Sequence, residues 1–378
     1  MSLALHWFLP TTGDGRDVVG AHVGARGRVA AAATRPPDAG YLRQVALAAD
    51  GLGFEGVLTP TGTWCEDAWI TSAALAAATT RLRFIVAVRP SSVSPTAAAQ
   101  MACTLSGVSA GRVDLNVVTG GDTADLRRFG DWLGHDERYA RTDEFLTVLR
   151  GAWSGVPADF DGAHYRVEGA TVARAPSTPP RIFFGGASEA AARVSARHAD
   201  VHVAWAEPPA GVAEQLDLVR GHSGLRDPGA APLAFGLRVH VITRETADEA
   251  WAVADRLLAH LDPRDVASAQ ERFAGHESEG QRRMNRLHSP SRNAGSTKTA
   301  GVQARPLEVS PNLWAGFGLV RPRAGTALVG SHDEVADRLA EYHDLGVSHV
   351  ILSGQPHLEE AYAVAEGLRP ALAARGLS

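Results

Sequence analysis

Arg238 and His240 could bind an anion and move a proton. They lie two residues apart in the apolar run Leu237–Ile242. Successive side chains of a β-strand point to opposite faces, so these two share one face and their apolar neighbours share the other. We expect the apolar face to pack against helices, which turns the guanidinium and the imidazole inward. A buried guanidinium needs an anionic partner. That partner is either an anionic ligand or an internal acid such as Asp114.

A second candidate anion site is the segment Gly185-Gly186-Ala187-Ser188-Glu189, which follows the short apolar run Ile182–Phe184 and begins a predicted helix. Free backbone N–H groups at a helix N-terminus bind phosphate and similar anions. The simpler interpretation is that Ser188 only caps the helix.

Other reactive side chains give weaker indications. Cys65 follows the apolar run Gly56–Thr59, but no basic neighbour in the sequence would lower the pKa of its thiol. His135 and Tyr139 share one helical face, either in a site or on the surface. The sequence contains no His-Glu-x-x-His motif. Its Gly-x-Ser-x-Gly match, Gly107–Gly111, stands just before a predicted strand, whereas a serine nucleophile in this motif follows a strand. We therefore expect neither a catalytic metal nor a serine nucleophile.

These residues depend on an alternation of strands and helices for their placement. The short apolar runs that we predict to be strands are Leu5–Leu9, Gly56–Thr59, Phe84–Val88, Val113–Thr119, Ile182–Phe184, Val201–Trp205, Leu237–Ile242 and His349–Ser353. The clearest amphipathic helices between them are Tyr41–Leu52, Asp67–Ala77, Glu137–Trp153, Glu189–His198, Ala247–Leu261 and Asp333–Leu345. Gly53, Gly111 and Gly346 stand just before strands, where helices commonly end on glycine.

Eight strands separated by helices predict an α/β protein, a TIM (β/α)8 barrel formed by one domain over residues 1–378. The alternative is an open doubly wound sheet, but Pro10–Gly15 has no Gly-x-Gly-x-x-Gly turn. The polar segment His288–Arg305 predicts a flexible insertion at about 288–325, a mobile lid before the eighth strand. Asp161-Gly162 predicts a small β-hairpin.

The composition excludes several classes of protein. A net charge of −5 and a pI near 6.3 argue against a nucleic-acid binder. No apolar run reaches membrane length, and the N-terminus does not look like a secretory signal. The two cysteines, Cys65 and Cys103, cannot form a disulfide framework. We expect a protein of the reducing cytoplasm.

An ordered set of motifs covers nearly the whole chain and resembles one family, the two-component, reduced-FMN-dependent alkanesulfonate monooxygenases of the bacterial-luciferase-like superfamily. The motifs are Trp7-Phe8-Leu9-Pro10-Thr11, Pro60-Thr61-Gly62 with Cys65-Glu66-Asp67-Ala68-Trp69, Asn116-Val117-Val118-Thr119-Gly120, Trp205 with Glu207-Pro208-Pro209, Arg238 with His240-Val241-Ile242, and Ser310-Pro311-Asn312-Leu313-Trp314-Ala315-Gly316.

This resemblance implies an enzyme of sulfur metabolism that uses reduced FMN and O2 to cleave the carbon–sulfur bond of an organosulfonate, giving an aldehyde and sulfite. It implies an NAD(P)H-dependent FMN reductase as partner, and a homo-oligomer, either a dimer or a tetramer. Neither a nucleic acid nor a membrane is expected as a partner.

The resemblance also assigns residues by position. The implied catalytic residues are Arg238, His240, Arg321 and Cys65. The implied substrate-binding residues are Trp205, His357, Gln355 and Arg238, and the implied FMN-binding residues are Asp67, Thr119, Tyr139, Gly186 and Ser188. Ser188 and its N–H neighbours would lie at the phosphate.

Three departures from the family pattern leave the substrate open. Gln355 stands where the family carries tyrosine, Trp64 stands where it carries a small residue, and the segment Ser291–Arg305 is longer. A luciferase-like monooxygenase acting on a sulfone, a heterocycle or a natural-product intermediate is the alternative enzyme. A non-catalytic flavin- or anion-binding barrel is the third hypothesis.

Overall fold

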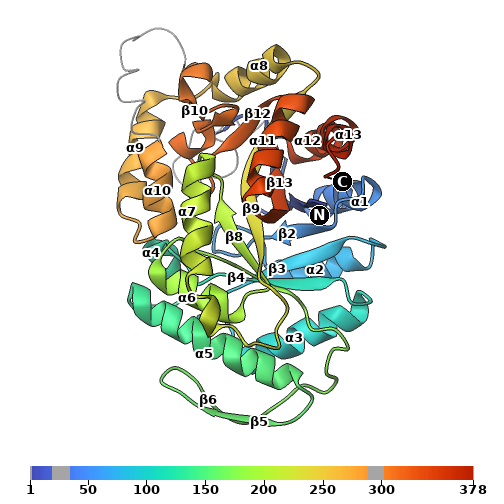
Figure 1. Ribbon diagram of the computed structural model, residues 1–378, viewed down its shortest axis with the longest axis vertical. Helices are drawn as coiled ribbons and strands as arrows, with labels where there is room; N and C mark the ends of the chain where they lie inside the picture. Colours follow the sequence, from blue (N-terminus) through green and yellow to red (C-terminus); the bar gives the residue numbers. More distant parts are fainter. Residues whose placement is uncertain (1, 19–34, 288–301, 378) are drawn as a thin grey trace.

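Eight parallel strands close into a barrel in the computed structural model, which describes residues 2–18, 35–287 and 302–377 (Figure 1). In spatial order they are β1 (Ala4–Phe8), β2 (Gly56–Thr59), β3 (Arg83–Val88), β4 (Val113–Val117), β7 (Ile182–Gly185), β8 (Val201–Trp205), β9 (Ala234–Arg244) and β13 (Val347–Ser353). Strand β13 pairs with both β9 and β1, with Leu352 opposite Trp7. This closure confirms the predicted TIM barrel and excludes the open sheet, and each predicted strand is found.

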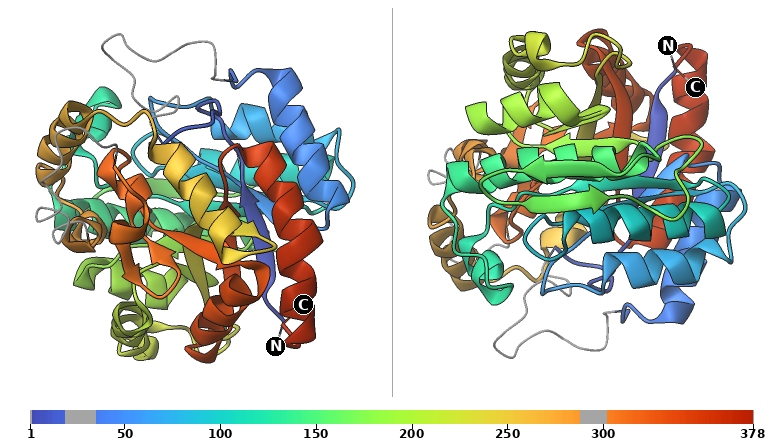
Figure 2. Two further views of the ribbon diagram at one scale, coloured as in Figure 1. Left: turned by 90° about the horizontal axis from the view of Figure 1, so that it is seen from above. Right: turned by 90° about the horizontal axis from the view of Figure 1, so that it is seen from below.

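Helices surround the barrel, as Figure 1 and the views from above and below it show (Figure 2). They are α1 (Ala39–Gly51), α2 (Ala68–Ala76), α3 (Pro95–Val108), α4 (Thr123–Arg128), α5 (His135–Trp153), α6 (Glu189–His198), α7 (Pro209–Arg220), α8 (Ala247–Leu258), α9 (Pro263–Ala274), α10 (Glu279–Leu287), α11 (His332–Asp344), α12 (His357–Ala363) and α13 (Arg369–Ala374). The six predicted helices are confirmed within two residues at most ends. None of the helices in these described ranges is long and apolar enough to cross a membrane.

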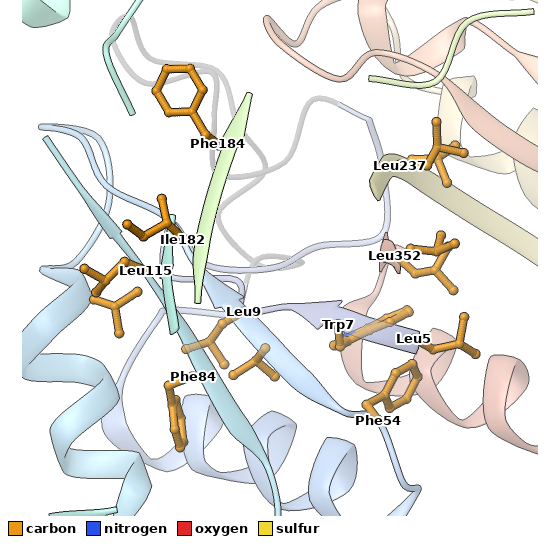
Figure 3. Close-up of a cluster of buried hydrophobic side chains, with 14 of the residues drawn as sticks. Leu5, Trp7, Leu9, Phe54, Phe84, Leu115, Ile182, Phe184, Leu237 and Leu352 are labelled. Atoms are coloured by element: carbon orange, nitrogen blue, oxygen red, sulfur yellow. The ribbon is translucent and has the colours of Figure 1, made fainter. Parts of the chain in front are cut away.

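The main core lies between the outer face of the barrel and the helices. Figure 3 shows apolar side chains of β1, β3, β4, β7, β9 and β13 on this face. Trp7 of β1 is fully buried and its ring lies 5.2 Å from that of Phe54. Leu237 and Leu352 belong to the same cluster. Because these side chains face the helices, the alternate residues of each strand face the barrel interior.

Local caps position the helices that follow the strands. Ser94 and Ser188 begin α3 and α6, and each accepts a hydrogen bond from the backbone N–H three residues later. Gly53, Gly111 and Gly346 adopt φ values of 81°, 84° and 102°, which a side chain would strain. Their predicted place between a helix and the next strand is confirmed.

Strand β9 is eleven residues long and has three partners. Its first half pairs with β8, its opposite edge pairs with β13, and its last residues pair with β12 (Ala327–Ser331). Strands β10 (Glu308–Ser310) and β11 (Leu313–Trp314) extend the sheet beyond β12. This register places the loop before β12 beside His240, whose backbone N–H donates to the carbonyl of Thr326 at 3.0 Å.

The insertion before β12 has its own small core. Residues 302–325 include the short helical turns η5 (Arg305–Leu307) and η6 (Gly316–Leu319), and Trp314 and Phe317 are fully buried there. Most of the predicted segment 288–305 lies outside the described residues. Movement of this insertion as a lid therefore stays a prediction.

The predicted hairpin at Asp161-Gly162 is confirmed. Strands β5 (Ala158–Asp161) and β6 (Arg166–Ala170) pair antiparallel, and the N–H of Gly162 donates to the carbonyl of Tyr165 at 2.9 Å. The hairpin lies beside α5 (Figure 1). Tyr165, in its turn, donates from its hydroxyl to the carbonyl of Pro90 at 2.6 Å, just after β3.

Candidate active site

A cavity of about 290 Å³ opens at the carboxyl ends of the barrel strands. Residues from the ends of different strands line it, among them Phe8, Leu58, Ala87, Val117, Gly185, Val203, Arg238 and Ile351. This is the end at which TIM barrels carry their active sites. Arg238, His240, Arg321, Trp205 and His357, all predicted site residues, lie on its wall.

Arg238 is buried, with 8% of its surface exposed, and it lies 4.8 Å above the ring of Phe8. Its Nη1 donates to the carbonyls of Val239 and Ile351 at 2.8 and 3.2 Å, and its Nη2 donates to Ser353 Oγ at 2.8 Å. Burial, together with the nearby Arg321 guanidinium, lowers the pKa of Arg238 to about 9, so it is charged at neutral pH. The inward orientation predicted for this residue is confirmed.

The predicted alternative, an ion pair of Arg238 with Asp114, is wrong. The carboxylate of Asp114 is bound by Arg83 at 2.8 Å and by Arg181 at 2.9 Å, near the amino ends of the strands. No carboxylate among the described residues lies within ion-pair distance of Arg238. The charge of this guanidinium is thus available to a ligand.

His240 is held at both ring nitrogens. Its Nδ1 lies 2.6 Å from Ser353 Oγ, and its Nε2 lies 3.1 Å from the carbonyl of Ala324. The ring stacks on Phe317 at 4.1 Å. Since the Ala324 carbonyl can only accept, Nε2 carries the proton and Nδ1 accepts from Ser353. Burial, followed by repulsion from Arg238, keeps the pKa of His240 well below its usual value, so the ring is neutral.

Ser353 joins these two groups and was not among the predicted site residues. It is the last residue of β13 and lies directly opposite His240 in the register with β9. Its hydroxyl accepts from Arg238 and donates to His240. The feature of the sequence that could have indicated Ser353 is its position at the carboxyl end of a predicted strand.

Arg321 approaches from the loop after η6. Its Nε donates to the carbonyl of Val18 at 2.7 Å, and its guanidinium lies 5.1 Å from the Phe317 ring. Burial lowers the pKa of Arg321 to about 10, and the acids Asp14 and Asp17 oppose this shift from a distance. Two charged guanidiniums, neither of which bonds to a carboxylate within the described part of the chain, therefore share one wall of the cavity.

His357 is the first residue of α12 and is anchored by Asp14. Its backbone N–H and its Nδ1 donate to the Asp14 carboxylate at 2.6 and 3.0 Å, and the hydroxyl of Tyr41 donates to the same group. Burial alone would raise the pKa of Asp14, but His357 and these hydrogen bonds lower it to about 2. Asp14 is therefore ionised and holds the proton of His357 on Nδ1.

The predicted FMN residues Thr119, Tyr139 and Gly186 line the opposite part of the cavity. Gly186 has φ 152°, and a Cβ there would lie 2.5 Å from the Ala191 Cβ and 2.9 Å from the Tyr139 hydroxyl. The backbone can therefore approach a ligand closely only as glycine. Ser188 does not line the cavity; it accepts from the N–H of Ala191 at 3.2 Å and lies near the Tyr139 hydroxyl. A tyrosine hydroxyl beside the start of α6 fits a phosphate.

Three other predicted residues do not reach the cavity wall. Cys65 turns its thiol to the carbonyls of Pro60 and Gly62, both at 3.6 Å, and burial raises its thiol pKa to about 11. Asp67 is exposed and caps α2. Gln355 is buried, and its amide donates to the carbonyl of Asp17. Cys65 and Asp67 thus bond within their own loops, whereas Gln355 bonds to the connection after β1.

One group of possible metal ligands occurs among the described residues, at the other end of the barrel. His6 Nε2 and His349 Nδ1 lie 3.0 Å apart, and the carboxylate of Glu55 near them binds Arg181 at 2.6 Å. This cluster is remote from the cavity.

The closed barrel and the cavity at its carboxyl end define the class of protein. The chain belongs to the luciferase-like monooxygenase family, whose model matches residues 4–349.

Solved structures of similar shape include enzymes with different substrates. A riboflavin lyase, solved with a modified FMN and riboflavin, has a TM-score of 0.76 and 19% identity over 100% of this chain and 93% of that chain. The EDTA monooxygenase of Chelativorans sp. BNC1 has a TM-score of 0.72 and 18% identity over 100% and 95%. A long-chain alkane monooxygenase has a TM-score of 0.73 and 18% identity over 100% and 92%. At this identity the likeness concerns the fold.

Proposed function

We propose that this protein is a monooxygenase that uses reduced FMN and O2 to cleave the carbon–sulfur bond of an organosulfonate, releasing an aldehyde and sulfite. The observation that carries the proposal is the pair Arg238 and Arg321, two buried guanidiniums on one cavity wall without a bonded carboxylate among the described residues. A sulfonate keeps its negative charge at neutral pH and offers three acceptor oxygens. It therefore suits planar, charge-assisted donors.

The flavin would lie against Thr119, Tyr139 and Gly186, with its phosphate at the start of α6, which Ser188 caps. Reduced FMN, when bound, supplies two electrons to O2, of which one oxygen atom enters the aldehyde and the other becomes water. A separate NAD(P)H-dependent FMN reductase would provide it. Membership of the luciferase-like family supports this assignment.

The side chains of the cavity have distinct parts in this reaction. Arg238 and Arg321 would orient the sulfonate and stabilise the charge that grows on sulfur oxygens as sulfite leaves. The carbon that becomes the aldehyde must lose a proton. His357 is suited to accept it, because Asp14 holds the proton of this imidazole on Nδ1 and Nε2 makes no hydrogen bond with the described residues. His240, which is neutral, keeps Arg238 in place through Ser353.

A sulfite-release assay tests the proposal. The full chain would be incubated in air with NADH, FMN, a flavin reductase and a panel of alkyl, hydroxylated and sugar sulfonates. Sulfite that requires the protein, the reductase and one of these substrates is the expected result. If FMN binds but no sulfonate yields sulfite, the sulfonate assignment is overturned, and a luciferase-like enzyme acting on a sulfone or a heterocycle replaces it. If neither FMN nor reduced FMN binds, the flavin assignment is overturned.

A further inference from the structure

The cavity contains a third unpaired guanidinium, that of Arg323, on a different wall from the other two. Arg323 follows Arg321 by two residues, but it lies over the ring of Trp64 at 4.2 Å, whereas Arg321 lies over Phe317. Both arginines line the cavity. The Pro322 turn between them directs their side chains to separate places, and the cavity therefore has two cationic regions.

No carboxylate among the described residues forms an ion pair with Arg323, although Asp122 and Asp125 attract it from farther away. The nearest acids already have partners: Asp125 binds Arg89 at 2.6 Å, and Asp122 accepts the backbone N–H groups of Ala124 and Asp125 at 3.0 and 3.1 Å. Among the described residues, no acceptor forms a hydrogen bond with the Arg323 guanidinium; only its backbone N–H donates, to Gln281. Residues 19–34 and 288–301 contain neither Asp nor Glu.

Arg89 adds unused donors to the same region. Only 4% of its surface is exposed, and it lines the cavity. Its Nη2 binds Asp125, but its buried Nε and Nη1 have no partner among the described residues. Buried donors of this kind cost free energy unless a ligand satisfies them.

We propose that the cavity recognises a substrate with two anionic groups, one held by Arg238 and Arg321 and the other by Arg323 with help from Arg89. The proposal rests on the proposed function in one respect, namely that the first group is the sulfonate that reacts. The second group is an anionic oxyacid at the far end of the same molecule, a carboxylate, a sulfonate or a phosphonate. All three present coplanar or clustered oxygens to a guanidinium.

The flavin phosphate is the competing occupant of this region. The structure favours a different place for it, because Tyr139 and the glycine backbone at Gly186 lie together at the start of α6. Neither Arg89 nor Arg323 hydrogen bonds with those residues. A second anionic group on the substrate accounts for Arg323 without moving the phosphate.

Equilibrium binding to the full chain tests this inference, with and without saturating FMN. The probes are two molecules of similar length, butane-1-sulfonate with one charge and 3-sulfopropanoate with two, measured by tryptophan fluorescence or calorimetry. We expect the wild type to bind the dianion at least about 10-fold more tightly, since a buried charge-assisted contact is worth that much or more. In Arg323→Gln the ratio of the two dissociation constants should fall to about 1, and in Arg323→Lys to an intermediate value.

A matched control is Arg166→Gln, an arginine on β6 with 72% of its side chain exposed, which should keep the wild-type ratio. Equal affinities in the wild type, or a ratio that survives Arg323→Gln in a protein that still binds butane-1-sulfonate, would overturn the inference. So would a loss of FMN affinity in Arg323→Gln with the ratio unchanged, because the region would then serve the flavin.

Failure of the proposed function is distinguishable from failure of this inference. Glutarate and 3-phosphonopropanoate also have two anionic groups but no sulfonate. If they bind with the same dependence on Arg323 while no sulfonate yields sulfite, recognition of two anionic groups stands and the desulfonation proposal fails. If sulfite forms but neither dianion is preferred, the reverse holds.

Discussion

The carboxylate of Asp14 accepts two hydrogen bonds from His357, one from the backbone N–H at 2.6 Å and one from the imidazole Nδ1 at 3.0 Å. The two residues are 343 positions apart in the chain, and they meet because β1 and β13 close the barrel. The pair links the start of α12 to the connection after β1. It also decides which nitrogen of the imidazole faces the cavity.

Asp14→Asn should therefore reduce turnover while leaving substrate affinity less affected. The neutral amide no longer favours the proton on Nδ1, so the fraction of His357 with a free Nε2 falls. We expect kcat to drop by at least about 10-fold, as for an impaired general base. Steady-state kinetics and ¹⁵N NMR of the imidazole would measure both effects. The control is Asp38→Asn, which removes only the cap of α1. If kcat and the tautomer of His357 were unchanged in Asp14→Asn, Asp14 would have no part in orienting His357.

Ser353→Ala should destabilise the fold and disturb two groups at once. The hydroxyl is shared between Arg238 Nη2 and His240 Nδ1, and its loss leaves both buried atoms without that partner. Such losses cost about 1–3 kcal/mol. Urea unfolding would give the free energy, and affinity for the sulfonate should fall in parallel. Ser348→Ala on the same strand, with only a 3.5 Å contact, should change neither. Wild-type stability and affinity in Ser353→Ala would contradict the bridging role.

Arg238→Ala should abolish most of the selectivity for anionic substrates. Removing one partner of a buried charge-assisted contact costs about 2–5 kcal/mol, which lowers kcat/KM roughly 30-fold or more. Arg238→Lys keeps the charge but loses the planar fork, so its activity should lie between those of the wild type and the alanine variant. Sulfite production at the wild-type rate by Arg238→Ala would exclude the residue from substrate binding.

Ser188→Ala should weaken FMN binding, and the loss of a helix cap alone should not do so. Both Ser188 and Ser94 cap a helix by accepting a backbone N–H, at 3.2 and 3.3 Å. Each alanine substitution should cost about 1 kcal/mol of stability. Only Ser188 lies near Tyr139, a residue of the cavity wall, so only its variant should raise the dissociation constant of FMN in a fluorescence titration. Equal FMN affinity in both variants would leave Ser188 as a helix cap.

Asp114→Asn should reveal how the charge of this carboxylate, at the amino end of the barrel, makes the free energy of unfolding depend on pH. Burial would raise the pKa of Asp114, but hydrogen bonds from Arg83 and Arg181 lower it below its usual value. A carboxyl with a lowered pKa stabilises the fold above its unfolded pKa of about 3.9, and this stabilisation is lost as the pH falls through the folded pKa.

At pH 7 we expect this variant to lose about 2–3 kcal/mol in urea unfolding. This is less than for a fully enclosed pair, because the side chains of Arg83 and Arg181 are 28% and 32% exposed. The difference from the wild type should shrink below about pH 4. Asp217→Asn, in the exposed pair with Arg220, should have no measurable effect. A difference that persists undiminished at pH 3 would contradict this account.

The positions of the eight strands along the chain and the inward direction of Arg238 and His240 followed from the sequence, because both depend on local periodicity. A strand of alternating side chains has only two faces, and the apolar face must pack against the helices. Family resemblance likewise placed Trp205, Arg321 and His357 at the cavity. For these residues, the position within the family's motifs was sufficient to predict that they line the cavity.

Side-chain direction within loops could not be obtained in this way. Cys65 and Gln355 occupy the expected loops, but neither lines the cavity. The Cys65 thiol turns to carbonyls of its own loop, and the Gln355 amide donates to a carbonyl in the connection after β1. Ser353, Asp14 and Arg323 escaped notice because their roles arise from partners far away in the chain. Periodicity reports which face of an element is apolar, whereas hydrogen bonds and ion pairs form between residues that only closure of the barrel brings together.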